Sequence, residues 1–296
     1  MHPDAPGPIE RRLLAELSPA FTAHHVDAGG ARLRYLEGGS GPTVVLVHGR
    51  GQAATMWLPY LPALAQRWRV IAVDLPGFGL SQPPAVKPAD AEAALAFFAR
   101  PVEALLTQLA PGPFAYVGHS LGGLVGLELA LRGQVPVERL ALIAPMGASP
   151  SMTTGSRFFF RAGPERLART FGRKVFSRLV PPLPPPWGEP LGALEHELLT
   201  TPGGRAAAAA AFDALYPLFG PQLHRRERLG EVKQPTLLLW GQKDVVFPVA
   251  EAEDVRRRLP NAILHTPPLG HAPHLEKPDV VLPMLLDFLE GKTPNA

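Results

Sequence analysis

The chain has no cysteine, which excludes disulfide bonds, thiolate metal sites and a cysteine nucleophile together. Charged residues make up only 19% of its 296 residues, against 46% hydrophobic residues, as is typical of soluble globular proteins. It also lacks an apolar run approaching the roughly 18 residues of a membrane-spanning helix. The N-terminus has no basic start followed by an apolar stretch. We therefore expect no transmembrane helix, no secretory signal and a cytoplasmic location.

A concentrated basic surface is missing as well. The net charge is +3, and the arginines are dispersed apart from short clusters such as Arg225-Arg226 and Arg256-Arg257-Arg258. A nucleic-acid site would place basic residues on one face with aromatic residues between them, and no such pattern is visible. We interpret the clusters as solvated helix faces and expect neither a nucleic-acid nor a membrane partner.

The most informative stretch is the glycine-flanked serine in Gly118-His119-Ser120-Leu121-Gly122. An apolar run, Phe114 to Val117, predicts a buried strand before it, and a mostly apolar helical pattern follows Ser120. The G-x-S-x-G pattern needs this context, because its serine lies on a strained turn between strand and helix. The two glycines avoid side chains that would press on neighbouring elements. Ser120 is therefore the candidate nucleophile.

The rest of the chain predicts an α/β fold with a predominantly parallel, doubly wound sheet, because apolar strands alternate with helices. An opening hairpin is expected at Ala23–Asp27 and Leu33–Leu36. The expected further strands are Thr43–Val47, Arg69–Val73, Phe114–Val117, Leu140–Ala144, Thr236–Trp240 and Ala262–His265, and the expected helices include Met56–Arg67, Asp90–Leu109 and Val280–Leu289.

This alternation stops between residues 146 and 233, which contain helical patterns but no convincing strand. Helices are expected at Arg157–Leu179, Leu191–Leu199 and Ala206–Leu218, and the proline run 181–186 predicts a stiff connector. We therefore predict a core formed by residues 1–145 and 234–296, with 146–233 as an inserted helical cap. An insertion after the carboxyl end of a strand would lie over the site.

A serine hydroxyl needs a base within hydrogen-bonding reach and a carboxylate that orients the base. Asp244 follows the predicted strand Thr236–Trp240, and His271 follows Ala262–His265, so both would share the sheet edge of Ser120. Their order along the chain, Ser, Asp, His, is the one expected for this architecture. His274 lies in the same loop and is the alternative base, but His271 follows a glycine that lets the loop turn inward.

Attack on a carbonyl creates an oxyanion, which two backbone N–H groups can stabilise. Leu121 N–H is one candidate, since it opens the helix after Ser120. Arg50 N–H, in the loop His48-Gly49-Arg50-Gly51, is the other. The Arg50 side chain points either into the pocket or toward solvent or a structural partner. His48 is expected to brace this loop, and His119 to pack or bridge loops.

Aromatic residues could line an apolar acyl or aromatic pocket, although such residues more often form the core of an insertion. The candidates for substrate contact are Trp57, Phe158, Phe159, Trp187 and Tyr216, with Phe160, Phe212 and Phe219 as further members. Nothing in the sequence calls for a metal ion or a cofactor, and we expect neither.

Taken together, these motifs resemble the α/β-hydrolase fold family with a helical cap. The resemblance covers residues from about 25 to 290 and includes Asp74–Ser81 and Trp240-Gly241-Gln242-Lys243-Asp244 besides the loops above. It implies a cofactor-independent serine hydrolase that cleaves carboxylic esters of small to medium apolar acyl or aromatic substrates through an acyl-enzyme. We expect a monomer or homodimer that acts on a small molecule.

Several relatives imply other activities. Haloalkane dehalogenases and epoxide hydrolases carry an aspartate nucleophile in place of Ser120. Carbon–carbon bond hydrolases of aromatic degradation usually carry a tryptophan after the catalytic histidine, where this chain has Ala272, although Arg157 or Arg161 could serve as a cap arginine. An acyltransferase or perhydrolase would share the same three residues. A ligand-binding protein without turnover is a further alternative.

Overall fold

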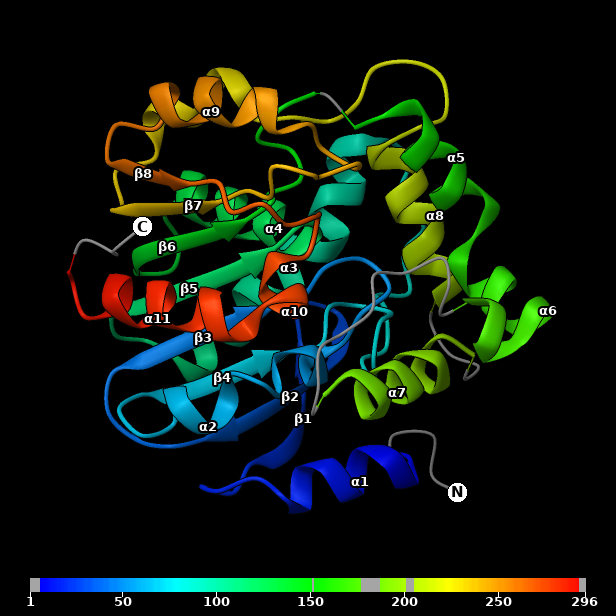
Figure 1. The fold of residues 1–296 in the computed structure, drawn as a ribbon. Helices are drawn as coiled ribbons and strands as arrows, with labels where there is room; N and C mark the ends of the chain where they lie inside the picture. Colours follow the sequence, from blue (N-terminus) through cyan, green and yellow to red (C-terminus); the bar gives the residue numbers. More distant parts are fainter. Residues whose placement is uncertain (1–5, 151, 177–186, 201–204, 293–296) are drawn as a thin grey trace.

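The computed structural model describes residues 6–150, 152–176, 187–200 and 205–292. Its centre is one eight-stranded sheet with the order β1-β2-β4-β3-β5-β6-β7-β8. β2 runs antiparallel to both β1 and β4, and every other neighbouring pair is parallel (Figure 1). The strands are β1 Thr22–Ala28, β2 Ala31–Gly38, β3 Thr43–Val47, β4 Arg69–Val73, β5 Phe114–His119, β6 Val137–Ile143, β7 Thr236–Leu239 and β8 Ala262–His265. The predicted α/β class and the mostly parallel sheet are confirmed.

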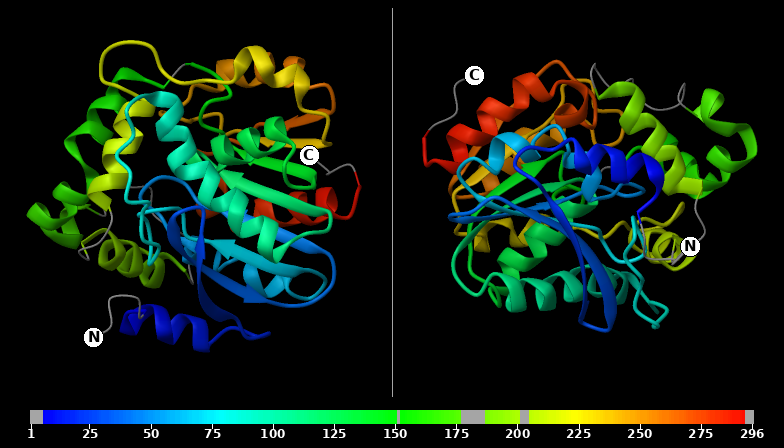
Figure 2. Two further views of the ribbon diagram at one scale, coloured as in Figure 1. Left: turned by 180° about the vertical axis from the view of Figure 1, so that it is seen from behind. Right: turned by 90° about the horizontal axis from the view of Figure 1, so that it is seen from below.

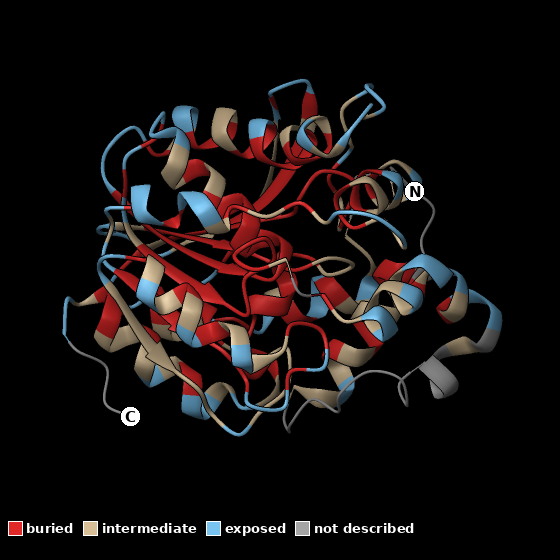
Figure 3. Cartoon of the chain, turned by 90° about the horizontal axis from the view of Figure 1, so that it is seen from above, coloured by how far each residue is buried: buried red, intermediate tan, exposed pale blue. Residues whose placement is uncertain are grey.

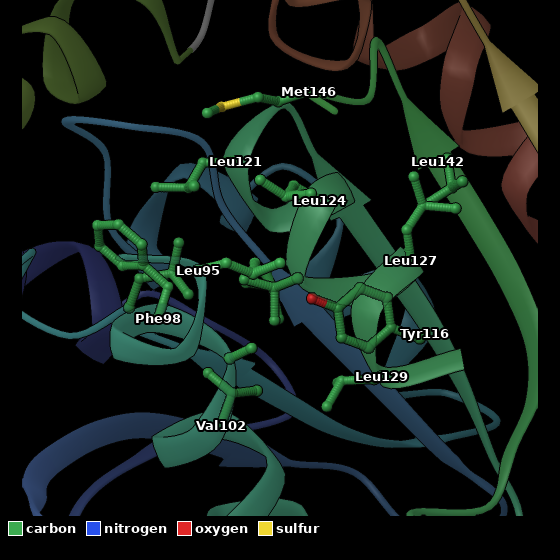
Figure 4. Packing of buried hydrophobic residues seen from close by; sticks show 14 of the residues in the cluster. Leu95, Phe98, Val102, Tyr116, Leu121, Leu124, Leu127, Leu129, Leu142 and Met146 are labelled. Atoms are coloured by element: carbon green, nitrogen blue, oxygen red, sulfur yellow. The ribbon is translucent and has the colours of Figure 1, made fainter. Parts of the chain in front are cut away.

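Both faces of the sheet are buried, which explains why the central strands read as continuous apolar runs. Alternate residues of β3 serve two hydrophobic clusters: Val45 and Val47 belong to one, Val44 and Leu46 to the other. The first cluster joins the sheet to α3 Ala91–Leu109, α4 Leu121–Arg132 and α9 Ala252–Arg258, and Figure 4 shows its packing around β5 and α4. The second joins it to α1 Pro8–Ala15, α2 Leu61–Leu64 and α11 Pro278–Leu289. Figure 3 shows the buried residues concentrated along the sheet between these layers.

The stretch predicted as one helix over Met56–Arg67 is instead two short pieces. A 3-10 helix covers η1 Ala54–Trp57 and a single turn covers α2 Leu61–Leu64. Pro59 and Pro62 explain the difference, because neither has the backbone N–H that a continuous helix would need. Three other short elements lie in the last part of the chain: η2 Arg226–Glu231, η3 Val249–Glu251 and α10 Pro273–Glu276.

The described parts of residues 146–233 consist of helices and the loops that join them, with no strand among them. The helices are α5 Thr154–Ala162, α6 Pro164–Phe176, α7 Gly188–Thr200 and α8 Arg205–Leu215. They lie at the end of the sheet where the parallel strands finish (Figures 1 and 2). The helix expected over Arg157–Leu179 is divided at Gly163, which has a φ of +81° and precedes a proline. The proline run 181–186 lies outside the described residues.

The insertion is not isolated from the core. α8 packs on α3, and α7 packs on α1. Ala211, Phe212 and Leu215 of α8 belong to the same hydrophobic cluster as the sheet. The division of the chain at residues 146 and 233 stays a prediction.

A buried ionic cluster, which sequence analysis did not anticipate, ties the N-terminal helix to the sheet. Arg34 on β2 is 1% exposed and donates hydrogen bonds to Glu10 of α1 and to Asp74 Oδ2 after β4 (3.4 Å to Asp74). Asp74 also accepts from the N–H groups of Ala54 (2.6 Å) and Leu80 (2.9 Å). Burial raises the pKa of Glu10 even though Arg34 lies beside it.

Replacing Arg34 with methionine should destabilise the fold strongly, because Glu10 and Asp74 would remain buried without their cation. Removing one partner of a buried ion pair typically costs about 3–5 kcal/mol. Urea unfolding of Arg34→Met should therefore show a loss of this size, while Arg12→Met, on the exposed side of α1, should change stability little. A loss below about 1 kcal/mol, the range of exposed ion pairs, would contradict this role for the cluster.

Among the described residues, no helix combines the length and the apolar character that a bilayer crossing requires.

Candidate active site

Ser120 lies on a strained turn between β5 and α4. Its backbone has φ 49° and ψ −110°, a region that residues other than glycine seldom adopt. The flanking glycines make the turn possible. A Cβ at Gly118 would lie 2.5 Å from the Gly122 carbonyl oxygen, and a Cβ at Gly122 would lie 2.4 Å from the Val47 carbonyl oxygen. The steric reason given for both glycines is confirmed.

The structure places His271 between Ser120 and Asp244. His271 Nε2 lies 3.1 Å from Ser120 Oγ, and His271 Nδ1 lies 2.8 Å from Asp244 Oδ2. Ser120 and Asp244 are buried, at 7% and 8% exposed, while the His271 side chain is 17% exposed. The other Asp244 oxygen, Oδ1, accepts from the N–H groups of Val246 (2.8 Å) and Phe247 (2.9 Å). These bonds fix the carboxylate so that Oδ2 faces the imidazole.

The loops that carry Asp244 and His271 are joined backbone to backbone. Lys243 N–H donates to the Leu269 carbonyl oxygen at 2.8 Å. Gly241 allows this contact, because a Cβ there would lie only 2.0 Å from the Gly270 carbonyl oxygen. The two loops therefore hold Asp244 and His271 in register across the ends of β7 and β8.

His274, the alternative base, lies in a different environment. It is fully buried, and its ring packs 4.8 Å from Trp57 and 4.5 Å from His119, measured between ring centroids. Burial, with His271 nearby, lowers the pKa of His274 to about 3. Tyr60 Oη donates to its backbone carbonyl at 2.7 Å. His274 thus packs as a neutral side chain behind the site.

His119, next to Ser120, bridges two loops. Its Nε2 lies 3.1 Å from the His271 carbonyl oxygen and its Nδ1 lies 3.2 Å from Gln52 Oε1. Burial lowers the pKa of His119 well below its usual value, with His274 and His271 adding to the effect. This geometry agrees with the expected bridging role.

The loop after β3 is braced as expected for His48. Leu75 N–H donates to His48 Nε2 at 2.9 Å, and His48 Nδ1 lies 2.7 Å from the Gly49 carbonyl oxygen. Gln52 Oε1 accepts from Gly49 N–H at 3.0 Å, which closes the loop on itself. A Cβ at Gly49 would lie 2.6 Å from His119 Nδ1, so the loop packs directly on the turn that carries Ser120.

Arg50 and Leu121, the two candidate oxyanion donors, flank this turn. Leu121 is the first residue of α4, where a helix leaves its N–H groups without intrahelical partners. The Arg50 guanidinium carbon lies 4.9 Å from the Phe212 ring centroid and 5.1 Å from that of Phe160. The Arg50 side chain therefore reaches from the loop after β3 to α5 and α8 and lines the cavity above Ser120.

That cavity has a volume of about 560 Å³ and opens above Ser120 and His271. Its wall includes Arg50 and Gln52 from the loop after β3, Val246 from the loop after β7 and Leu275 from α10, and α5 and α7 contribute Phe159, Phe160, Glu195 and Leu199. Burial raises the pKa of Glu195, on α7, to about 7. The wall is mainly apolar and has a few polar side chains, as is usual for small-molecule sites.

Of the five residues expected to contact substrate, only Phe159 lines this cavity. Trp57 is fully buried behind the site, and Phe158 is 53% exposed on the outer side of α5. Trp187 packs against the second hydrophobic cluster. Tyr216 is buried, and its hydroxyl accepts from Gly147 N–H at 2.9 Å. These four therefore differ from the expectation, because three of them pack against the hydrophobic clusters and Phe158 is exposed.

The two arginines considered for the cap also lie apart from the cavity wall. Arg157 donates to the Leu218 carbonyl oxygen at 3.0 Å, and Arg161 pairs with Asp213 at 2.6 Å. The cations of the wall are Arg50 and Lys243.

Glu276 is a positioning residue that sequence analysis missed. Its two oxygens accept from the N–H groups on either side of His271, from Gly270 at 2.8 Å and from Ala272 at 3.3 Å. The sequence signal was its place five residues after His271, at the end of the single turn α10. Glu276 therefore holds the backbone that aims the imidazole.

Removal of this carboxylate should disturb catalysis more than folding. For Glu276→Ala we expect kcat for ester hydrolysis to fall by about 10- to 100-fold, with KM nearly unchanged, because a small misplacement of a catalytic group costs up to about 10². Glu276→Gln keeps one acceptor oxygen, so its kcat should lie between those of the wild type and Glu276→Ala. Glu138→Ala, an exposed change on β6, is the control. An unchanged kcat for Glu276→Ala would refute the positioning role.

Residues 42–278 match the model of the alpha/beta hydrolase fold family. The chain belongs to this family. The matched residues include the strands from β3 to β8, the helices α5 to α8 and all three residues of the Ser120–His271–Asp244 arrangement, and the assignment agrees with the resemblance seen in the sequence.

The curated relatives of this α/β hydrolase include an esterase and a hydrolase of another type. It is 30% identical over 255 residues to pimeloyl-[acyl-carrier protein] methyl ester esterase of Nitrosomonas europaea, covering 81% of this chain and 93% of the relative. It is 28% identical over 272 residues to 2-hydroxy-6-oxo-2,4-heptadienoate hydrolase of Pseudomonas putida, covering 90% and 95%. It is also 33% identical to part of polyketide synthase ThaQ of Burkholderia thailandensis, where the match covers 97% of this chain but 14% of the synthase.

A solved structure with the same fold is carboxylesterase CesB (YbfK) from Bacillus subtilis. It superposes with a TM-score of 0.77 at 20% identity and covers 96% of each chain. At this identity the likeness concerns the fold alone.

Proposed function

We propose that this α/β hydrolase cleaves carboxylic esters of small to medium apolar acyl or aromatic substrates through an acyl-enzyme on Ser120. The observation that carries the proposal is the pair of contacts of His271, 3.1 Å from Ser120 Oγ and 2.8 Å from Asp244 Oδ2. A nucleophile, its base and the carboxylate that orients the base are the parts that acyl transfer needs.

In the first half-reaction, Ser120 Oγ attacks the ester carbonyl carbon while its proton moves to His271 Nε2. Asp244 stabilises the imidazolium that forms and keeps the Nδ1 proton in place. The N–H groups of Leu121 and Arg50 stabilise the oxyanion. The C–O bond to the alcohol then breaks, and the leaving alcohol takes the proton from His271.

In the second half-reaction, water attacks the acyl-enzyme carbonyl while His271 Nε2 takes a proton from it. Collapse of the second tetrahedral intermediate releases the carboxylic acid, and Ser120 Oγ recovers its proton from His271. No cofactor takes part in either step. If an alcohol or peroxide replaced water here, the same residues would perform acyl transfer or perhydrolysis.

The proposal is tested by the hydrolysis of p-nitrophenyl esters with acyl chains of increasing length. Because the cavity holds about 560 Å³, we expect kcat/KM to rise with acyl length and then to fall once the chain exceeds the cavity. Folded protein that hydrolyses none of these esters would refute esterase activity.

A second candidate activity is cleavage of a carbon–carbon bond, which the similarity to a 2-hydroxy-6-oxo-2,4-heptadienoate hydrolase favours. Against it, Ala272 follows His271, and Arg157 and Arg161 lie apart from the cavity wall. Parallel assays with an oxo-dienoate and with simple esters would separate the two candidates by their relative kcat/KM.

A further inference from the structure

One polar side chain of the cavity has no role in the proposed chemistry. Glu195 projects from α7 of the cap into the wall of the cavity that holds Ser120. Within the part of the chain that the structure describes, no hydrogen bond or ion pair engages its carboxylate. The residue is only partly buried, and its side chain borders the cavity, whose wall is mainly apolar. The few polar side chains in such a wall are the groups that usually orient a ligand.

Nearby side chains do not supply a structural explanation. The other carboxylate of the wall, Glu276, is bound to the N–H groups of Gly270 and Ala272. The Arg50 guanidinium lies between the rings of Phe160 and Phe212. Burial raises the pKa of Glu195 to about 7, and no cation or hydrogen-bond donor among the described residues offsets that effect.

We propose that Glu195 determines specificity by binding a hydroxyl group on the chain of the ester substrate. The inference rests on the proposed esterase function and refines it: the preferred substrates are hydroxylated esters rather than purely aliphatic ones.

A hydroxyl fits this position better than an ammonium group for two reasons. Burial raises the pKa of this carboxyl group to about 7, and a hydroxyl can donate to the carboxylate or accept from the carboxylic acid. An ammonium group can pair only with the carboxylate, and it would also enter a cavity whose wall carries the cations of Arg50 and Lys243.

The test compares esters that differ only at the chain end. Each ω-hydroxy ester is paired with the ester in which a methyl group replaces the hydroxyl, over several chain lengths. The hydroxyl is placed on the acyl side in p-nitrophenyl ω-hydroxyalkanoates and on the alcohol side in ω-hydroxyalkyl acetates, so that either orientation is sampled. The ratio of kcat/KM within a pair cancels any effect of a variant on the chemistry itself.

Wild-type protein should prefer the hydroxy ester of at least one pair. In Glu195→Leu this ratio should fall by at least about tenfold, because a site that hydrogen-bonds a hydroxyl discriminates strongly by means of that contact. Glu195→Gln keeps a donor and an acceptor and should retain part of the preference. Glu189→Gln, an exposed carboxylate change at the start of the same helix, should leave the ratio unchanged.

Binding measured without turnover separates this inference from the proposed function. In the Ser120→Ala background, calorimetry should show tighter binding of the hydroxy ester, and Glu195→Leu should abolish the difference. Glu195→Leu should also keep or raise Tm at pH 8, because it removes a desolvated charge; a structural carboxylate would lower Tm when removed. Equal ratios in wild type and Glu195→Leu, or a stronger gain for an ω-ammonium ester, would overturn the hydroxyl assignment whether or not Ser120 is catalytic.

Discussion

Ser120→Ala is expected to lower kcat for ester hydrolysis on the order of 10⁴-fold or more, because the proposed acyl-enzyme cannot form without Oγ. Residual turnover would come from the oxyanion donors and from binding alone. The measurement is steady-state hydrolysis of p-nitrophenyl esters by highly purified protein, so that trace contamination does not set the floor.

The fold should survive this change. Alanine has the same Cβ as serine, so the strained backbone at φ 49° is neither relieved nor worsened. Circular dichroism and Tm should match the wild type. A Ser120→Ala protein that keeps more than a tenth of the wild-type kcat would show that another group performs the attack.

Asp244→Asn is the second change with a large expected effect, about 10⁴-fold in kcat. The N–H groups of Val246 and Phe247 require an oxygen at the Oδ1 position, so the amide NH₂ would take the place of Oδ2 and face His271. His271 Nδ1 would then have to accept a hydrogen bond, which places the ring proton on Nε2. The ring nitrogen next to Ser120 could no longer take the serine proton.

This reasoning predicts little change in KM and little loss of stability, because the asparagine keeps the two backbone hydrogen bonds. Asp244→Ala removes those bonds as well and should lose both activity and stability. If Asp244→Asn retained nearly full kcat, the tautomer argument would fail, and with it the role given to Asp244.

The sheet and the three aligned residues could be predicted because their signals are local. Each central strand is a continuous apolar run, and each of Ser120, Asp244 and His271 lies in a short glycine-containing loop after such a run. Parallel strands bring loops of this kind to one edge, so chain order and strand order together predicted the juxtaposition. The His271 contacts agree with that prediction.

The cavity wall could not be predicted in the same way. Which face of a cap helix turns inward depends on how α5, α7 and α8 pack against the core, and aromatic content carries no information about that. Phe158 and Phe159 are adjacent in sequence, yet one is exposed and the other lines the cavity. Glu276 and Glu195 were missed because a single acidic residue in a helix normally faces solvent.

The short helices around Pro59 and the buried Glu10–Arg34–Asp74 cluster were missed for related reasons. The apolar pattern over residues 56–67 is typical of a helix, but Pro59 and Pro62 interrupt the backbone hydrogen bonds that a continuous helix needs. The ionic cluster joins residues far apart in the chain, and its members look individually like surface charges. Contacts between residues so far apart in the sequence can be recognised only once the arrangement of the strands is known.

The most direct test of the central claim is the intact mass of the protein after reaction with a fluorophosphonate, followed by peptide mapping. We predict one adduct per chain, located on Ser120, with loss of ester hydrolysis in proportion to labelling and with no adduct on Ser120→Ala. Folded wild-type protein that takes no label, or that is labelled elsewhere while activity persists, would contradict an activated serine at position 120.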